Sequence, residues 1–309
     1  MPVASVAAEA KVFRVGVLDL LSPANSDFIK YLVPGLAKLG YVVGQNAGYA
    51  FRHLDWDSSK APRFAEELVG LRPDVLVAES DPVIKSLADR TTTIPIVGAC
   101  ADPVGSGFTQ SLSRPGRNIT GFSLNAPGVA AKRIEFLKAI VPRLEHVAIL
   151  GKEGPGNDQV SQIIERAAID QGVVTSRMFF RDRSDVANGL QALKRKGVRA
   201  ALDLLVSPSL LDDEEYARLA ISAGIAVAYG SSDNELLLIG YHQSWEVALH
   251  WLRSRWPYMI DRVLRGTPPG DLPFELPDRY HLKINLATAR ALRLTIPEAL
   301  LLQADKIIR

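Results

Sequence analysis

The first 125 residues alternate short apolar runs with amphipathic stretches. Five apolar runs predict strands, over residues 12–20, 47–52, 75–78, 94–99 and 118–123. Between them, apolar side chains recur at helical spacing over residues 27–39, where Gly40 ends the pattern, and over residues 59–71 and 81–90. Strands that alternate with helices form parallel sheets covered on both faces. This part of the chain therefore predicts a doubly wound α/β lobe.

A second series of the same kind follows Asn125. Its predicted helices cover residues 129–140, 158–171, 185–196 and 212–223. Its predicted strands cover residues 147–150, 173–180, 200–206 and 226–228. Two sheets of about five strands are more economical than one sheet of ten, so we expect two Rossmann-like lobes.

The last seventy residues break this alternation. A long helical pattern over residues 244–264 ends in a loop rich in glycine and proline at residues 265–270. We interpret this helix as a return of the chain to the first lobe. More than one segment then connects the two lobes, which predicts a hinge. Lobe one is then residues 11–125 plus 241–268, and lobe two is residues 126–240 plus 269–309. Within the tail, residues 282–286 predict a strand and residues 287–292 a helix, packed across a lobe.

Composition and charge exclude several classes of protein. The 309 residues carry 36 Lys and Arg against 34 Asp and Glu, with no basic block, so we expect no nucleic-acid partner. The single cysteine, Cys100, excludes an internal disulfide framework. No apolar run approaches the ~20 residues of a membrane span. Residues 1–10 lack the basic and apolar regions of an intact signal peptide, although an exported precursor could have been trimmed.

The sequence lacks the motifs of common catalytic and cofactor sites. The turn after the first strand, at residues 19–25, has neither G-x-G-x-x-G nor a Walker lysine, and no G-x-S-x-G occurs. The five histidines show no metal-ligand spacing. We therefore expect no catalytic residue, no cofactor and no metal. The alternative is an enzyme on a doubly wound scaffold that uses Asp102 and His242 as an acid–base pair.

Polar and aromatic side chains gather at the predicted carboxyl ends of the strands, where doubly wound sheets bind ligands. The polar candidates are Ser22, Asn25, Ser80, Asp81, Asp102, Ser123, Asn125, Ser207, Ser231 and His242. The aromatic candidates for stacking on a ligand ring are Phe122, Tyr229, Tyr241 and Trp245. Any single Ser, Asp or Asn could instead be a helix cap or turn former. The set as a whole predicts a cleft for a small polar or aromatic ligand.

Several segments resemble one family when taken in order and spacing. They are residues 39–46 (LGYVVGQN), 91–97 (TTTIPIV), 102–107 (DPVGSG), 113–123 (SRPGRNITGFS), 131–137 (AKRIEFL) and 284–301 (INLATARALRLTIPEALL). Together they resemble the uncharacterised-type ABC transporter substrate-binding proteins that include tryptophan and tyrosine binders, over nearly the whole chain.

The resemblance implies a type I periplasmic-binding-protein fold, whose two lobes close on a small molecule and hand it to ABC permease subunits. It implies a periplasmic or otherwise extracytoplasmic location and no catalysis, and we expect a monomer. An aromatic amino acid or related aromatic acid is the preferred ligand.

Three departures from the family pattern bear on the ligand pocket. Residues 80–82 read Ser-Asp-Pro where the family commonly has Gly-Thr-Pro, which places a carboxylate where an anionic ligand is otherwise expected. Residues 151–157 replace a turn that often contains tryptophan. Arg117 replaces a glycine before Asn-Ile-Thr. We therefore expect a pocket that differs from those of its relatives.

Overall fold

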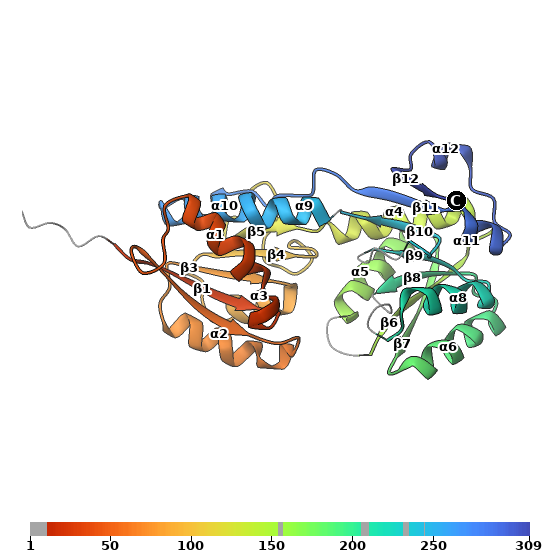
Figure 1. The fold of residues 1–309 in the computed structure, drawn as a ribbon, viewed down its shortest axis with the longest axis horizontal. Helices are drawn as coiled ribbons and strands as arrows, with labels where there is room; N and C mark the ends of the chain where they lie inside the picture. The colour runs from red at the N-terminus through yellow and green to blue at the C-terminus, as the bar shows by residue number, and fades with distance from the viewer. Residues whose placement is uncertain (1–10, 154–156, 205–209, 231–234, 244) are drawn as a thin grey trace, which may run out of the picture. The chain divides into compact units, whose positions relative to one another are not determined.

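The computed structural model (Figure 1) describes residues 11–153, 157–204, 210–230, 235–243 and 245–309, without the side chain of Trp245. The chain divides into two compact units. The first comprises residues 1–124 and 246–276, and the second comprises residues 125–245 and 277–309. The chain therefore passes from one unit to the other three times.

The first unit is built on a five-stranded parallel sheet in the order β2-β1-β3-β4-β5. Its strands are β1 (Phe13–Asp19), β2 (Ala47–His53), β3 (Val75–Glu79), β4 (Ile96–Cys100) and β5 (Ile119–Ser123). The five predicted strands are thus confirmed. Nearly every residue of β1, β3, β4 and β5 is buried, as continuous apolar runs between two helical layers require.

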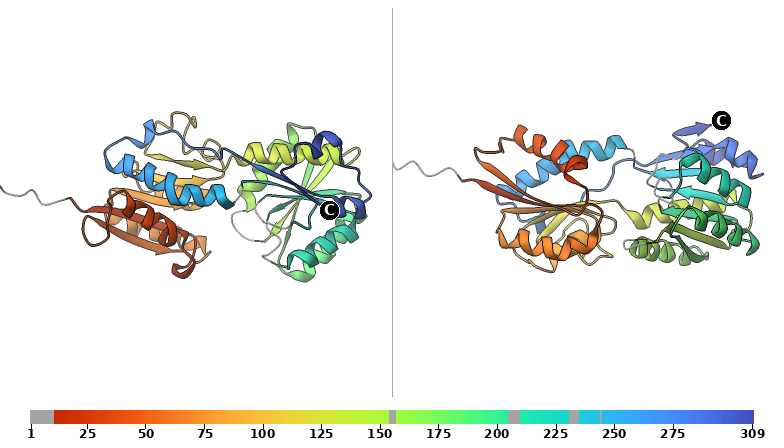
Figure 2. Two further views of the ribbon diagram at one scale, coloured as in Figure 1. Left: turned by 45° about the horizontal axis from the view of Figure 1, so that its top comes forward. Right: turned by 60° about the horizontal axis from the view of Figure 1, so that its bottom comes forward.

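Helices cover both faces of this sheet. One face packs against α2 (Ala61–Gly70) and α3 (Asp81–Ala88). The other packs against a π-helical turn η2 (Phe28–Leu32), α1 (Val33–Lys38) and α10 (Trp256–Leu264), as Figure 2 shows. Short 3-10 turns lie at Pro23–Asn25, Ser58–Lys60 and Pro269–Asp271.

The second unit is built on a seven-stranded sheet in the order β12-β11-β10-β9-β8-β6-β7. Its strands are β6 (His146–Lys152), β7 (Val174–Phe180), β8 (Ala200–Leu204), β9 (Ala226–Tyr229), β10 (Ile239–His242), β11 (His281–Asn285) and β12 (Lys306–Ile308). Neighbouring strands are parallel except β10 and β11. The expectation of about five strands is therefore corrected to seven.

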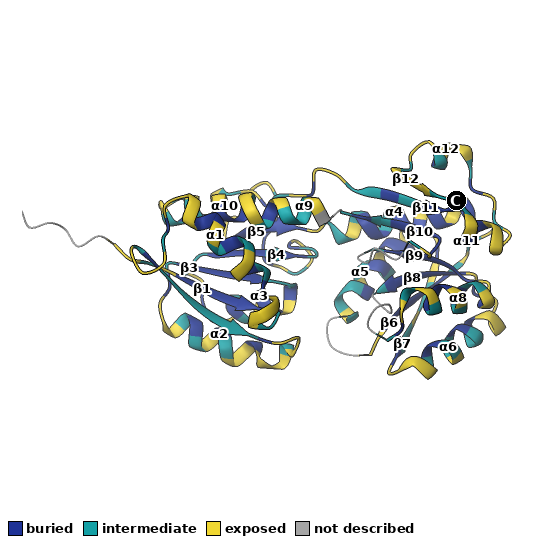
Figure 3. Ribbon diagram, viewed as in Figure 1, coloured by how far each residue is buried: buried dark blue, intermediate teal, exposed yellow. Residues whose placement is uncertain are grey.

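Helices again cover both faces. One layer holds α4 (Ala126–Ile140), α5 (Asn157–Ile169), α11 (Leu286–Ala291) and α12 (Glu298–Leu301). The other holds α6 (Arg183–Arg195) and α8 (Asp213–Ala223). The outer sides of these helices are exposed, and most residues of β6, β8, β9 and β10 between them are buried (Figure 3).

The limits of the units differ from the expected lobes at two places. Residues 241 and 242 lie in β10, which pairs with β9 and β11, so they remain in the second unit. Residues 269–276 stay with the first unit, because Glu275 forms a bridge with Phe122 and its carbonyl accepts a hydrogen bond from Ser123 N at 2.8 Å. Backbone pairing, which the apolar pattern did not reveal, fixes both limits.

The predicted long helix over residues 244–264 is interrupted. It consists of α9 (Trp245–His250), a π-helical turn η4 (Trp251–Arg255) and α10. Pro257 follows the π turn, and proline has no N–H to continue the regular ladder of hydrogen bonds.

Candidate functional site

The carboxyl end of β1 is organised around Asp19, which is fully buried. Its carboxylate accepts hydrogen bonds from Leu21 N at 2.9 Å and from the Ser26 hydroxyl, and His53 Nδ1 lies 3.5 Å from it. Ser26 Oγ in turn accepts from Ile29 N at 3.1 Å. These hydrogen bonds therefore hold in place the loop that carries the predicted residues Ser22 and Asn25. Ser22 is partly exposed and Asn25 is exposed.

Acidic groups gather beside this loop. Glu79, the last residue of β3, is half-buried, and burial together with the charges of Asp19 and Asp27 raises its pKa to about 7. Burial is the main cause that raises the pKa of Asp27 above its ordinary value. The charge of Lys30 opposes this shift, and the charge of Asp19 adds to it. Sequence reasoning missed all three residues. This end of the first sheet is thus an environment in which negative charge is costly.

Asp81 and Asp102 hold the loop that follows β4. Asp81 is buried, and its carboxylate accepts from Ala101 N at 2.7 Å and from Ser106 Oγ at 2.5 Å. Asp102 accepts from Gly105 N at 2.9 Å. The Asp81 carboxylate therefore stabilises the DPVGSG loop. The preceding residue, Ser80, has a positive φ of 70°, which turns the chain sharply into α3.

Phe122 is a core residue, and its predicted role of stacking on a ligand is wrong. It is fully buried, with its ring centroid 4.8 Å from that of Trp251 and 5.7 Å from that of Trp256. Ser123 beside it is also buried. Phe122 belongs to the hydrophobic packing under α10, and β5 is covered on both faces.

An exposed indole that sequence reasoning missed lies at the same edge of the sheet. Trp56 follows β2 and has 70% of its surface exposed, and its backbone N–H donates to Leu20 O at 2.9 Å. Asp55 and Trp56 both adopt a positive φ, of 52° and 62°. Two such residues in succession are uncommon outside glycine. A signal was available, since the indole stands in a polar segment directly after a predicted strand.

Tyr229 is likewise buried, against expectation. It is 1% exposed, and its ring lies over Gly240, where an added Cβ would stand 2.4 Å from the ring. His242 is 8% exposed, and its Nδ1 donates to Gln243 O at 2.7 Å. Both side chains therefore pack inside the second unit, and Tyr229 cannot offer a free ring face.

Tyr241 lies among other aromatic side chains of the second unit. Its ring stacks on that of Tyr280 at 5.6 Å and meets Phe136 edge-on at 5.3 Å. Tyr280 is hydrogen-bonded to Asn125, whose left-handed backbone (φ 50°) begins α4. Burial raises the pKa of both tyrosines above the ordinary value. The Asn125 side chain thus anchors this aromatic cluster at the start of α4.

Arg133 is a functional candidate that sequence reasoning missed. It is 8% exposed on the inner face of α4, and its Nε donates to Tyr241 O at 3.1 Å. Burial lowers the pKa of its guanidinium to about 10, while the charge of Asp203 opposes the shift. The signal lay in the helical pattern, because Arg133 occupies the apolar stripe of Val129, Ala130, Ile134 and Leu137.

Three predicted residues lie outside the described part of the chain. They are Ser207, Ser231 and the side chain of Trp245. For the enzyme alternative, Asp102 belongs to the first unit and His242 to the second, and each is engaged locally as given above. The alternative gains no support from these contacts.

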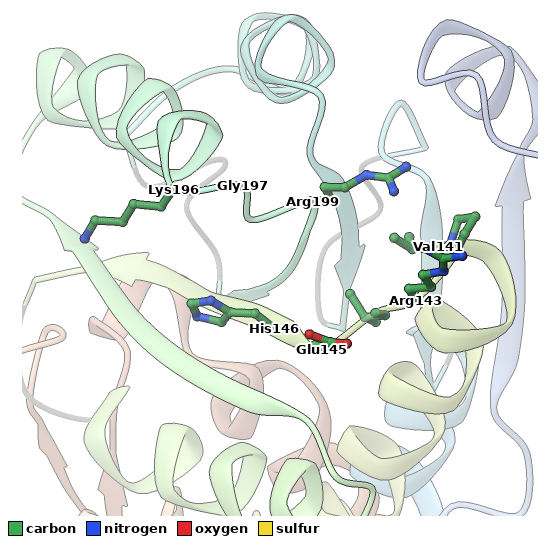
Figure 4. Close-up of a pocket in the computed structure, with 9 residues that line it drawn as sticks. Val141, Arg143, Glu145, His146, Lys196, Gly197 and Arg199 are labelled. Carbon is green, nitrogen blue, oxygen red and sulfur yellow. The ribbon is translucent and has the colours of Figure 1, made fainter.

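A separate pocket of 640 Å³ opens at the other edge of the second sheet (Figure 4). His146 begins β6 and Arg199 immediately precedes β8, so this pocket is at the amino ends of the strands. Arg143 and Lys196 add further positive charge to its wall, and Glu145 adds one negative charge. It is therefore distinct from the carboxyl edge.

The described residues contain neither a metal-binding cluster nor a helix able to span a membrane. No group of three or more His, Cys, Asp or Glu side chains within the described ranges is arranged to hold a metal ion. Among the same residues, no helix combines the length and apolar character of a membrane span.

Comparison with known proteins gave consistent matches. The model of the family "ABC transporter substrate binding protein" matches residues 14–209. A tyrosine-binding protein of Clostridioides difficile is 24% identical over 298 residues, covering 90% of this chain and 80% of that protein. Two crystal structures each share 25% identity and a TM-score of 0.72, covering 96% of this chain and all of theirs. One is a conserved domain protein from Vibrio cholerae and the other an ABC domain from Streptococcus pneumoniae in complex with L-Trp.

Proposed function

Because the chain belongs to the family of ABC transporter substrate binding proteins, we propose that it binds an aromatic amino acid or a related aromatic acid and delivers it to a membrane permease. The fold is that of type I periplasmic binding proteins, and the family consists of extracytoplasmic solute-binding proteins. We further propose that this chain acts in the periplasm as a monomer and catalyses no reaction.

The carboxyl ends of both sheets are the proposed ligand contacts. Ligands of open α/β sheets bind at this edge, where the strands end and the loops diverge. In the first unit, Ser22 and Asn25 stand on the loop that Asp19 holds in place, and Ser80 lies between the end of β3 and the start of α3. In the second, Tyr241 lies at the end of β10, and Ser207, Ser231 and Trp245 remain proposed contacts.

Trp56 is the observation that carries the preference for an aromatic ligand. An indole with 70% of its surface exposed at the carboxyl edge offers a large flat apolar face. Two relatives point the same way, since one is a tyrosine-binding protein and another was crystallised with L-Trp. Stacking of two aromatic rings contributes about 0.5–1.5 kcal/mol beyond area burial.

Calorimetric titration with L-tyrosine and L-tryptophan tests this proposal. We expect the wild type to bind these amino acids. We expect Trp56→Ala to bind them with about 3- to 10-fold lower affinity. Leu71→Ala is the control, because Leu71 is also exposed in the first unit but precedes β3, at the opposite edge of the sheet. Equal affinities in wild type and Trp56→Ala would remove the stacking role. Absence of binding to every aromatic acid would remove the ligand class.

A further inference from the structure

Arg133 reaches the carboxyl ends of three adjacent strands. Its Nε is bound to the carbonyl of Tyr241 in β10 at 3.1 Å, and Asp203, whose charge acts on it, is in β8. The guanidinium also lies directly against Gly230, the residue that follows β9. A side chain from α4 thus places positive charge at the edge of the sheet where ligands of this fold bind.

The guanidinium is buried without using most of its donors. A guanidinium has five N–H donors. Within the part of the chain that the structure describes, the guanidinium makes one hydrogen bond, from Nε to the carbonyl of Tyr241, and no carboxylate lies within ion-pair distance. Only 8% of the residue is exposed. Burying a charged donor without partners is costly, so proteins retain such a group where another molecule supplies the acceptor.

Asp203 is already engaged and does not fill this role. Its Oδ1 accepts from Tyr216 OH at 3.0 Å, and it is 3% exposed. Its charge favours the protonated guanidinium from a greater distance than an ion pair. Among the described residues of the second unit, the two terminal nitrogens of this charged guanidinium therefore have no recorded acceptor.

Gly230 makes room for this arrangement. A Cβ added at Gly230 would stand 1.5 Å from Nη2 and 2.1 Å from Nη1 of Arg133. The guanidinium therefore occupies the space that any other residue at this position would fill. Absence of a side chain at this strand end lets the guanidinium approach the backbone closely.

We propose that Arg133 is the subsite that recognises the carboxylate of the transported ligand, with its two terminal nitrogens donating to the two carboxylate oxygens. This inference rests on the proposed function and makes it narrower, since it requires a ligand with a carboxylate or an equivalent planar anion. The flat fork of an arginine matches a carboxylate with two parallel hydrogen bonds, which a lysine cannot do.

Three variants test the subsite in different ways. Arg133→Met keeps the volume and apolar stem but removes every donor, and replacing a buried charge by an apolar group need not destabilise the fold. Gly230→Ala leaves Arg133 present but displaces its guanidinium. That displacement requires only the far end of a flexible side chain to move. Arg133→Lys keeps the charge without the fork. Circular dichroism and thermal unfolding establish that each variant is folded.

The readout is the difference between paired ligands in calorimetric titration. The pairs are L-tyrosine with tyramine and L-tryptophan with tryptamine, which differ by the carboxylate alone. We expect wild type to prefer the amino acid of each pair, and Arg133→Met to lower amino-acid affinity by about 10- to 100-fold with little change for the amine. Arg133→Lys and Gly230→Ala are expected to fall between wild type and Arg133→Met.

The outcomes separate this inference from the proposed function. If wild type binds aromatic amino acids and Arg133→Met binds them equally well, the carboxylate subsite is wrong and the function stands. If wild type instead binds other carboxylates, such as aliphatic amino acids, and loses them in Arg133→Met, the subsite stands and the aromatic preference is wrong. Binding of uncharged solutes in place of carboxylates, by wild type and variant alike, would overturn the subsite.

Discussion

At the scale of single residues, the structure replaces several expected ligand contacts by packing and reveals charged groups instead. Phe122 and Tyr229 were predicted because they end strands, but a strand buried on both faces directs its last side chains into the core. Glu79 and Arg133 were missed because burial of a charge depends on what packs around it. Sequence patterns identified the edge of each sheet and not the orientation of each side chain.

Glu79 makes stability dependent on pH in a specific direction. Its pKa is about 7 in the folded protein and near 4.5 in an unfolded chain, so the folded state binds more protons between these values. The free energy of unfolding therefore falls as pH rises through this window, and the penalty is complete above pH 7. We expect Glu79→Gln to raise the free energy of unfolding above pH 7 by up to about 3 kcal/mol relative to wild type.

Thermal unfolding of wild type and Glu79→Gln at pH 5 and pH 8 measures this effect. The variant should gain stability relative to wild type at pH 8 and gain little at pH 5. Glu66→Gln is the control, because Glu66 is an exposed glutamate on α2 of the same unit. Parallel pH profiles for wild type and Glu79→Gln would show that the carboxyl group is ionised at no cost in the folded protein.

At the scale of elements, two π-helical turns pack against each other in the first unit. Each precedes a proline near the start of the next helix, Pro34 in α1 and Pro257 in α10. Phe28 stacks on Trp256 across this contact, with ring centroids 4.5 Å apart. The helical pattern predicted both stretches as continuous helices. It missed the interruptions because a π turn adds one residue to a turn without disturbing the apolar periodicity much.

Gly35 is a point of close approach between α1 and the segment formed by η4 and α10. An added Cβ would lie 2.5 Å from Pro257 Cγ and 2.9 Å from Arg253 O, which are a rigid ring and backbone. We expect Gly35→Ala to destabilise the protein by about 1–3 kcal/mol, because neither neighbour can move without separating the helices.

Gly70→Ala provides the matched control for this prediction. Gly70 ends α2, and nothing lies within 4 Å of the Cβ it would gain. We expect this variant to be as stable as wild type or more stable, by up to about 1 kcal/mol, because alanine favours helix. Chemical denaturation of the three proteins compares them. Equal loss in both variants would show that helix flexibility, and not the close contact, determines the cost.

Short elements at the end of the chain were the ones that prediction missed. β10 and β12 have four and three residues, and a run of that length carries little periodic signal. β10 joins the second sheet through β9 and pairs antiparallel with β11, which comes from a distant part of the sequence, and β12 joins through β11. The strands of the first unit have five to seven residues, and their apolar runs were long enough to predict all five.

At the scale of the whole molecule, the chain connects its two units three times, and the proposed ligand contacts are divided between them. A ligand that uses both sets must slow the opening of hydrogen bonds in both units, because binding to the folded state stabilises every part that contributes contacts. At about 100 times its Kd, a ligand adds about 2.7 kcal/mol. Hydrogen exchange resolves where this stabilisation appears.

We expect L-tyrosine or L-tryptophan at that excess to slow exchange of two groups of peptides. One group covers the strand ends of the first unit, at residues 19–27 and 79–81, and the other covers residues 129–133 and 226–230 of the second. Tyramine, which lacks the carboxylate, should protect the second group less. Protection limited to one unit would mean that the other contributes no contact, and the division of the site between two sheets would then be wrong.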